Sequence, residues 1–169
     1  QCAPYIGFPK TLNAIDIANG VFEANGISLP LENAGTVDAT DPSAREQAGA
    51  AIQAPLYGNE VKEVFSALPK PFDEFVPHLL TSSAFGDFAT RGGLDVAQRE
   101  LISLVAIAAI GASTQLRPHV AGAIRAGSSH QKVAAALVQV MPYIGGPYAL
   151  SGLVLVARYD ENSSSEAYR

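Results

Sequence analysis

Apolar side chains recur every three to four positions along most of the chain, and this spacing predicts amphipathic helices. The predicted helices cover residues 9–25, 57–68, 72–89, 95–110, 114–126, 133–140 and 147–159, with a further short helix from 43 to about 54. Glycine or proline stands at most of the joints between them. No segment alternates apolar and polar residues as a half-buried strand does, so we expect an all-α fold.

Helix caps can be placed at three of these joints. Asp95 with Gln98, and Ser128 with Gln131, have the spacing of capping boxes, in which two side chains satisfy free backbone N–H groups reciprocally. Residues 113–114, Ser-Thr, are expected to cap the helix that follows them. The joint between helices 95–110 and 114–126 is so short that these two helices must be antiparallel neighbours.

The order Pro-Tyr-Ile-Gly, then a second proline and a leucine, occurs twice at the same spacing. The matched positions are Pro4/Pro142, Tyr5/Tyr143, Ile6/Ile144, Gly7/Gly145, Pro9/Pro147 and Leu12/Leu150. We interpret residues 1–27 as the C-terminal helix of a truncated or degenerate first repeat, 28–48 as a linker, 49–162 as the helical domain and 163–169 as a polar tail. The alternative is a chance similarity between two helix–turn–helix joints.

Composition narrows the class of protein. Apolar residues make up 48% of the chain and charged residues only 16%, which favours a protein that covers surface with copies of itself. The net charge of −5 argues against nucleic acid and anionic membranes as partners. The longest apolar run, 101–112, is too short to span a bilayer, and we expect a cytoplasmic protein. The single cysteine, Cys2, excludes an intrachain disulfide.

Two residues stand out as candidates for chemistry. Glu100 is one of few charges in an apolar helix, and His119 lies early in the next helix. Alternatively, Glu100 is a solvated first-turn acid and His119 a histidine bonded to a backbone carbonyl. Counted from the joint between the two helices at about 1.5 Å per residue, Glu100 and His119 lie at heights along the helices that differ by about 7 Å. A direct hydrogen bond between them is therefore not guaranteed, and a water or a third side chain could bridge them.

An ordered set of short motifs extends the argument: Thr90-Arg91-Gly92-Gly93-Leu94, Arg99-Glu100, Leu116-Arg117-Pro118-His119, Ala126-Gly127 and the Pro142–Pro147 turn. Together they make roughly residues 57–156 resemble the carboxymuconolactone decarboxylase family, which includes the AhpD-type peroxidase partners. The resemblance implies an AhpD-like helical domain that forms homo-oligomers, trimers or hexamers, with sites near subunit contacts.

The peroxidase branch of that family does not fit this sequence. In AhpD-type relatives, an acid and a histidine at this separation relay protons to a CxxC pair. The two cysteine positions correspond here to Ala112 and Gln115, and Cys2 lies outside the motif. Without a dithiol, a peroxidase role is contradicted by the residues themselves.

The resemblance instead implies a cofactor-independent decarboxylase acting on a small carboxylated lactone or oxo acid, of the kind met in aromatic compound catabolism. His119 would donate the proton and Glu100 would orient it. Asp87 and Arg91 map onto a segment of the decarboxylases that contains an acid and a turn. This sequence has Asp where the decarboxylases have Glu, and Gly where their turn has Pro. Arg91 would anchor the substrate carboxylate, with Asp87 lining the site.

Several alternatives remain open. Arg99 is a candidate for substrate binding or for a structural ion pair. The same scaffold could instead support another acid/base reaction, such as isomerisation, dehydration or lactone opening. It could also belong to a non-catalytic oligomeric protein. The remaining histidines, His78 and His130, are expected to be structural or at the surface. No histidine has the partners of a metal site, so no metal or cofactor is expected.

Overall fold

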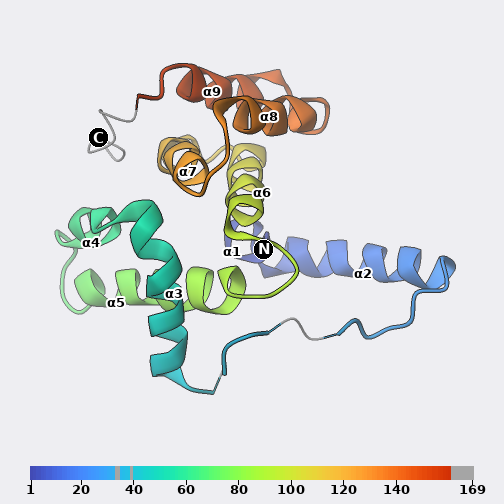
Figure 1. Cartoon of the computed structure of the whole chain (residues 1–169), viewed down its shortest axis with the longest axis horizontal. Helices are drawn as coiled ribbons and strands as arrows, with labels where there is room; N and C mark the ends of the chain where they lie inside the picture. Colours follow the sequence, from blue (N-terminus) through green and yellow to red (C-terminus); the bar gives the residue numbers. More distant parts are fainter. Residues whose placement is uncertain (33–34, 39, 161–169) are drawn as a thin grey trace.

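All regular structure in the described residues, 1–32, 35–38 and 40–160 of the computed structural model, is helical, as predicted (Figure 1). The elements are α1 (Ala3–Ile6), α2 (Phe8–Ala24), α3 (Pro42–Tyr57), α4 (Glu60–Phe65), α5 (Phe72–Leu79), the π-helix η1 (Leu80–Ala89), α6 (Val96–Ala109), α7 (Ser113–Arg125), α8 (His130–Ile144) and α9 (Gly146–Ala157). The predicted polar tail, 163–169, lies outside the described residues.

The main hydrophobic core is formed by the four C-terminal helices. In Figure 1, α8 and α9 cover one end of the α6–α7 pair. Fully buried aliphatic side chains from three of the four helices meet there: Leu104, Ile107, Leu116, Val120, Val133 and Leu137. The predicted antiparallel α6–α7 pair is thus the centre of the domain, and this packing fixes the relative positions of Glu100 and His119.

A second core lies between α3 and η1, where Leu56 and Tyr57 pack against Phe85 and Ala89. The two helices approach through glycines. A Cβ on Gly49 would stand 2.1 Å from the Thr81 carbonyl oxygen, so no larger residue fits there. Close backbone contact between α3 and η1 therefore fixes where Tyr57 lies.

Some helix ends differ from prediction. The capping box of Asp95 and Gln98 is confirmed. The box predicted for Ser128 is wrong by one residue, because Ser129 caps α8 while Ser128 is buried. The predicted cap at 113–114 is also wrong, since Ala112 is the N-cap of α7 and makes no side-chain hydrogen bond.

The region upstream of residue 90 is divided differently from prediction. Helix α3 begins at Pro42, capped by Asp41, so the chain becomes helical earlier than the predicted linker allows. Tyr57 ends α3 instead of opening the next helix, because Gly58 turns the chain with a φ of +54°. The predicted helix 72–89 is continuous, but its second half is wound as η1.

The repeated Pro-Tyr-Ile-Gly segment has the same turn in both copies. Gly7 has φ and ψ of 82° and 157°, and Gly145 has 89° and 149°. Each glycine joins the end of one helix to the start of the next. The reading of residues 1–27 as the remnant of an earlier module stays a prediction.

Helix α2 extends away from the other helices (Figure 1). It lies wholly within the described residues, and none of its side chains is buried. Large apolar side chains are exposed along it: Phe8, Leu12, Ile15, Ile17 and Val21. We refer to these five as the α2 apolar surface. No helix in the described ranges is long and apolar enough to cross a bilayer.

Candidate active site

The hydroxyl of Tyr57 connects Glu100 to His119. Its oxygen lies 2.5 Å from Oε2 of Glu100 and 3.0 Å from Nδ1 of His119. The direct distance from His119 Nδ1 to Glu100 Oε2 is 3.4 Å. A third side chain, a tyrosine, therefore bridges a pair that also lies close enough for direct contact. We refer to Tyr57, Glu100 and His119 as the relay.

The hydrogen bonds of the relay determine which imidazole nitrogen carries a proton. A phenol has one hydrogen, and Tyr57 donates it to the Glu100 carboxylate at the shorter distance. His119 must then donate from Nδ1 to the Tyr57 oxygen. In the neutral ring this leaves Nε2 as the free base, and in the charged ring Nε2 becomes the acid. The arrangement can thus present one exchangeable proton at Nε2.

The relay is almost fully withdrawn from solvent. The Glu100 side chain is 4% exposed and that of His119 12%. The ring of Tyr5 packs edge-on against the imidazole, with centroids 5.5 Å apart. Phe85 packs similarly against Tyr57. Burial strengthens the hydrogen bonds among these polar groups, because little water competes for them.

Three helices supply the relay. Glu100 lies near the start of α6, whose capping box fixes the first turn. Gly111, with a φ of +71°, reverses the chain so that α7 returns alongside α6 and brings His119 towards Glu100. Tyr57 reaches both from the last residue of α3. The geometry thus combines a local helical hairpin with a side chain distant in sequence.

Arg99 does not reach the relay. Its guanidinium donates to main-chain carbonyls of the η1–α6 turn, at Phe88, Arg91, Gly92 and Leu94. A further bond goes to the side-chain oxygen of Gln1. Burial, and secondarily the charge of Arg91, lowers the pKa of Arg99. Its donors hold the turn in place.

Asp87 and Arg91 lie together at a different place. Both line a cavity of about 400 Å³ beside Arg45. Asp87 accepts two hydrogen bonds from the Arg45 guanidinium, at 2.7 and 2.5 Å, and this pairing raises the pKa of Arg45. Within the described residues, neither Glu100 nor His119 lines this cavity. The predicted site residues thus fall into two groups: the relay pair and the Asp87–Arg91 pair.

Tyr57 was missed by sequence reasoning as a functional residue. The sequence signal for it was indirect, namely the calculated separation between Glu100 and His119, which left room for a bridging group. Nothing in the sequence around Tyr57 indicated which side chain that was, since Tyr57 is 43 residues from Glu100. The packing of α3 in the folded protein places Tyr57 there.

A comparison with protein-family models bears on the origin of this site. Residues 76–158 match the model of the Carboxymuconolactone decarboxylase family. The matched region contains Glu100 and His119, whereas Tyr57 lies upstream of it. No curated protein matches the chain. Residues 76–158, from the end of α5 through α9, are therefore a carboxymuconolactone decarboxylase family domain.

Proposed function

We propose that this protein is a cofactor-independent lyase of the carboxymuconolactone decarboxylase type, acting on a small carboxylated lactone or oxo acid. The observation that supports it best is the relay, a buried acid–tyrosine–histidine chain whose acid and histidine lie on a domain of that family. Such a chain supports proton transfer at one ring nitrogen without a thiol or coenzyme.

The proposed reaction needs little from the protein beyond a placed proton. Loss of CO₂ breaks a carbon–carbon bond and leaves its electron pair on the substrate, where a neighbouring carbonyl delocalises it. His119 then gives the Nε2 proton to that carbon. Glu100, acting through Tyr57, keeps Nδ1 protonated and stabilises the charged ring before transfer.

Arg91 is the proposed anchor for the substrate carboxylate, and Asp87 lines the same cavity. In the single chain this cavity does not include His119. We therefore propose that a second copy completes the site by bringing a cationic surface against the relay. The contacts of Arg99 favour a role in holding the turn that carries Arg91 over direct binding of substrate.

Assembly into a homo-oligomer, a trimer or hexamer, is part of this proposal. Most of the stability of a helix in a protein comes from packing of its apolar face, and no residue of α2 is buried in the single chain. The α2 apolar surface is exposed in the single chain. A second copy is the partner that fits, since it is always present and the chain carries little charge to oppose contact.

Two alternative functions are each supported by a specific observation. Because the cavity holding Arg91 is separate from His119, the relay could serve a reaction that needs no nearby carboxylate anchor, such as an isomerisation or the opening of a lactone. The same scaffold could also be a non-catalytic oligomeric protein, an alternative supported by the exposed α2 apolar surface.

The test is release of CO₂ from 4-carboxymuconolactone, measured together with consumption of the substrate. Wild-type protein is expected to release one CO₂ for each substrate lost. His119→Ala should lose at least about 100-fold in rate, the usual effect of removing a general acid. The matched control is His130→Ala, at an exposed histidine on α8 whose ring packs on Tyr159.

Each negative result overturns a different part of the proposal. Unchanged substrate with wild-type protein would exclude this reaction for that compound. Substrate loss without CO₂ would favour the isomerase or lactone-opening alternative. Activity that survives His119→Ala, with assembly intact by light scattering, would show that the relay is not the catalytic group.

A further inference from the structure

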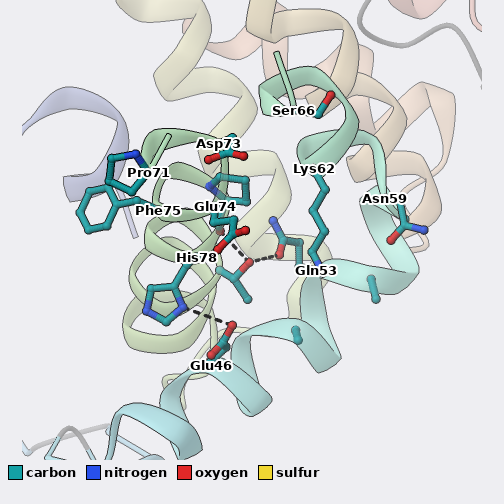
Figure 2. Close-up of a pocket in the computed structure, with 15 residues that line it drawn as sticks. Glu46, Gln53, Asn59, Lys62, Ser66, Pro71, Asp73, Glu74, Phe75 and His78 are labelled. Carbon is teal, nitrogen blue, oxygen red and sulfur yellow. Dashed lines mark hydrogen bonds and ion pairs between the residues drawn. The ribbon is translucent and has the colours of Figure 1, made fainter. Parts of the chain in front are cut away.

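One cavity in the described part of the chain lies away from the relay. It has a volume of about 890 Å³ and lies between α3, α4, α5 and the start of η1 (Figure 2). This volume lies within the range of pockets that hold small molecules. None of the three relay residues lines it, so it would act independently of the proposed function.

A buried amide on α3 faces this cavity without a partner. Gln53 is 7% exposed, and its Oε1 accepts a 2.6 Å hydrogen bond from the Thr81 hydroxyl. The Thr81 hydroxyl has one hydrogen and also lies 3.0 Å from the Pro77 carbonyl oxygen, so it donates to Gln53 at the shorter distance. In this orientation Nε2 of Gln53 points into the cavity, as Figure 2 shows. Among the described residues, Nε2 has no hydrogen-bond partner. A buried donor without a partner is costly, and a ligand with an acceptor would relieve that cost.

The opposite wall offers an unpaired acceptor. Asp73 on α5 lines the cavity, and its Oδ1 is buried without a hydrogen-bond partner in the described part of the chain. Its other oxygen lies 3.7 Å from the exposed Lys70 ammonium. The cavity therefore presents one unsatisfied donor, from Gln53, and one unsatisfied acceptor, from Asp73.

The charges around the cavity restrict what could enter. Glu46 and Glu74 line it with Asp73, giving three carboxylates. Against them stand Lys62 and a histidine, His78, whose Nδ1 lies 3.2 Å from Glu46. An anionic ligand would meet excess negative charge and bring no donor for Asp73. An amine would satisfy Asp73 but has no acceptor for Gln53.

A hydroxyl group is both donor and acceptor, and it carries no charge. We propose that this cavity binds an uncharged small molecule bearing hydroxyl groups, held between the Gln53 amide and the Asp73 carboxylate. One hydroxyl accepts from Nε2 of Gln53, and the same or an adjacent hydroxyl donates to Oδ1 of Asp73. Pro71, Phe75 and Pro77 also line the cavity and provide apolar contact for the carbon skeleton.

The test compares three probes of matched size on the full chain: trans-cyclohexane-1,2-diol, cyclohexylamine and cyclohexanecarboxylate. Binding is followed by ligand-observed NMR and by the side-chain amide resonances of Gln53. The diol is expected to bind more tightly than either charged probe and to shift the Gln53 amide signals.

Two variants and a control locate the binding. Gln53→Met removes the donor and keeps a side chain of similar size. Asp73→Asn replaces one of the two acceptor oxygens with an NH2 group, on a side chain that is partly exposed. Gln53→Met should weaken diol binding by about fivefold, the effect of one neutral hydrogen bond, and Asp73→Asn by about tenfold or more, because a hydrogen bond to a charged group is stronger. Gln115→Met, on the exposed first turn of α7, should leave it unchanged. Asp73→Asn alone carries the test if Gln53→Met does not fold by circular dichroism.

Three outcomes would overturn the proposal. The first is no detectable binding of the diol, which would mean that water alone fills the cavity. The second is preferential binding of the amine or the carboxylate. The third is diol binding that neither Gln53→Met nor Asp73→Asn changes, which would place the diol elsewhere on the chain.

Discussion

Gly122 on α7 lies directly against the hydroxyl of Tyr57. A Cβ added at Gly122 would stand 2.4 Å from the tyrosine oxygen and 2.9 Å from Oε2 of Glu100. Gly122 is buried in the middle of a helix, where glycine is otherwise unfavourable. The space that the Tyr57 hydroxyl occupies thus exists because α7 has no side chain at this position.

Gly122→Ala should therefore displace Tyr57 and break the relay. Helix propensity alone would favour alanine by about 1 kcal/mol, but the forced contact with buried polar atoms costs about 1–3 kcal/mol. We expect a net loss of stability and a loss of activity, measured by thermal unfolding and turnover. Gly20→Ala is the control, since nothing lies within 4 Å of its Cβ position and it should stabilise α2 slightly.

Tyr57→Phe should keep the packing against Phe85 but remove the bridging hydroxyl. The buried Glu100 then loses its closest donor, which costs about 1–3 kcal/mol of unfolding free energy. We expect turnover to fall with KM little changed, together with an altered ¹⁵N spectrum of the His119 ring. An unchanged ring spectrum would contradict the assignment of Nδ1 as the donor to Tyr57.

Arg99→Lys separates a structural role from substrate binding. A lysine cannot span the carbonyls of Phe88, Gly92 and Leu94 at once, so the turn before α6 should loosen. We expect a loss of about 2 kcal/mol or more in the free energy of unfolding, as for other buried charge networks. An intact stability with a raised KM would instead assign Arg99 to substrate binding.

Glu60 gives a pH dependence of stability with a definite sign. Burial raises its pKa above the ordinary value of 4.5, with Arg125 opposing the shift. The folded state then binds a proton more tightly than the unfolded chain, so stability falls as pH rises from 4.5 through the raised pKa. Glu60→Gln should remove this fall, as seen in denaturant melts across that range. Glu23→Gln, on the exposed α2, should not.

The α2 apolar surface should decide assembly. Leu12→Lys places a charge on it at a residue that is 62% exposed in the single chain. If a second copy covers this surface, the dissociation constant should rise about tenfold or more, the effect of losing one buried leucine. Asn13→Lys is the control for Leu12→Lys, because it adds the same charge at the neighbouring polar position, outside the α2 apolar surface. Equal light-scattering masses for wild type and Leu12→Lys would contradict the proposal.

The C-terminal half of the fold could be predicted from sequence because its signals are local. The apolar period, the Asp95 cap and the glycine at 111 together define the α6–α7 hairpin. Upstream, the local signals were weaker. The apolar residues that follow Tyr57 predict that it opens a helix, but Gly58 turns the chain directly after it, so Tyr57 is the last residue of α3.

The site was only partly predictable for a related reason. Glu100 and His119 follow from the helical hairpin, but helical rise alone put them about 7 Å apart in level, whereas Nδ1 of His119 lies 3.4 Å from Oε2 of Glu100. The position of Arg99 could not, because its partners are backbone carbonyls, which carry no sequence signal. Nor could the separation of Asp87 from the relay, since it depends on Arg45, 42 residues away.

The glycine contact between α3 and η1 has a consequence for the catalytic proposal. Where two backbones touch, no side chain can change rotamer to absorb a displacement. Gly49 is eight residues before Tyr57, or about 12 Å along the helix axis. A slight tilt of helix α3 about Gly49 would therefore move the Tyr57 hydroxyl away from the Glu100 carboxylate. Proton transfer at His119 then depends on a residue that touches none of the participants.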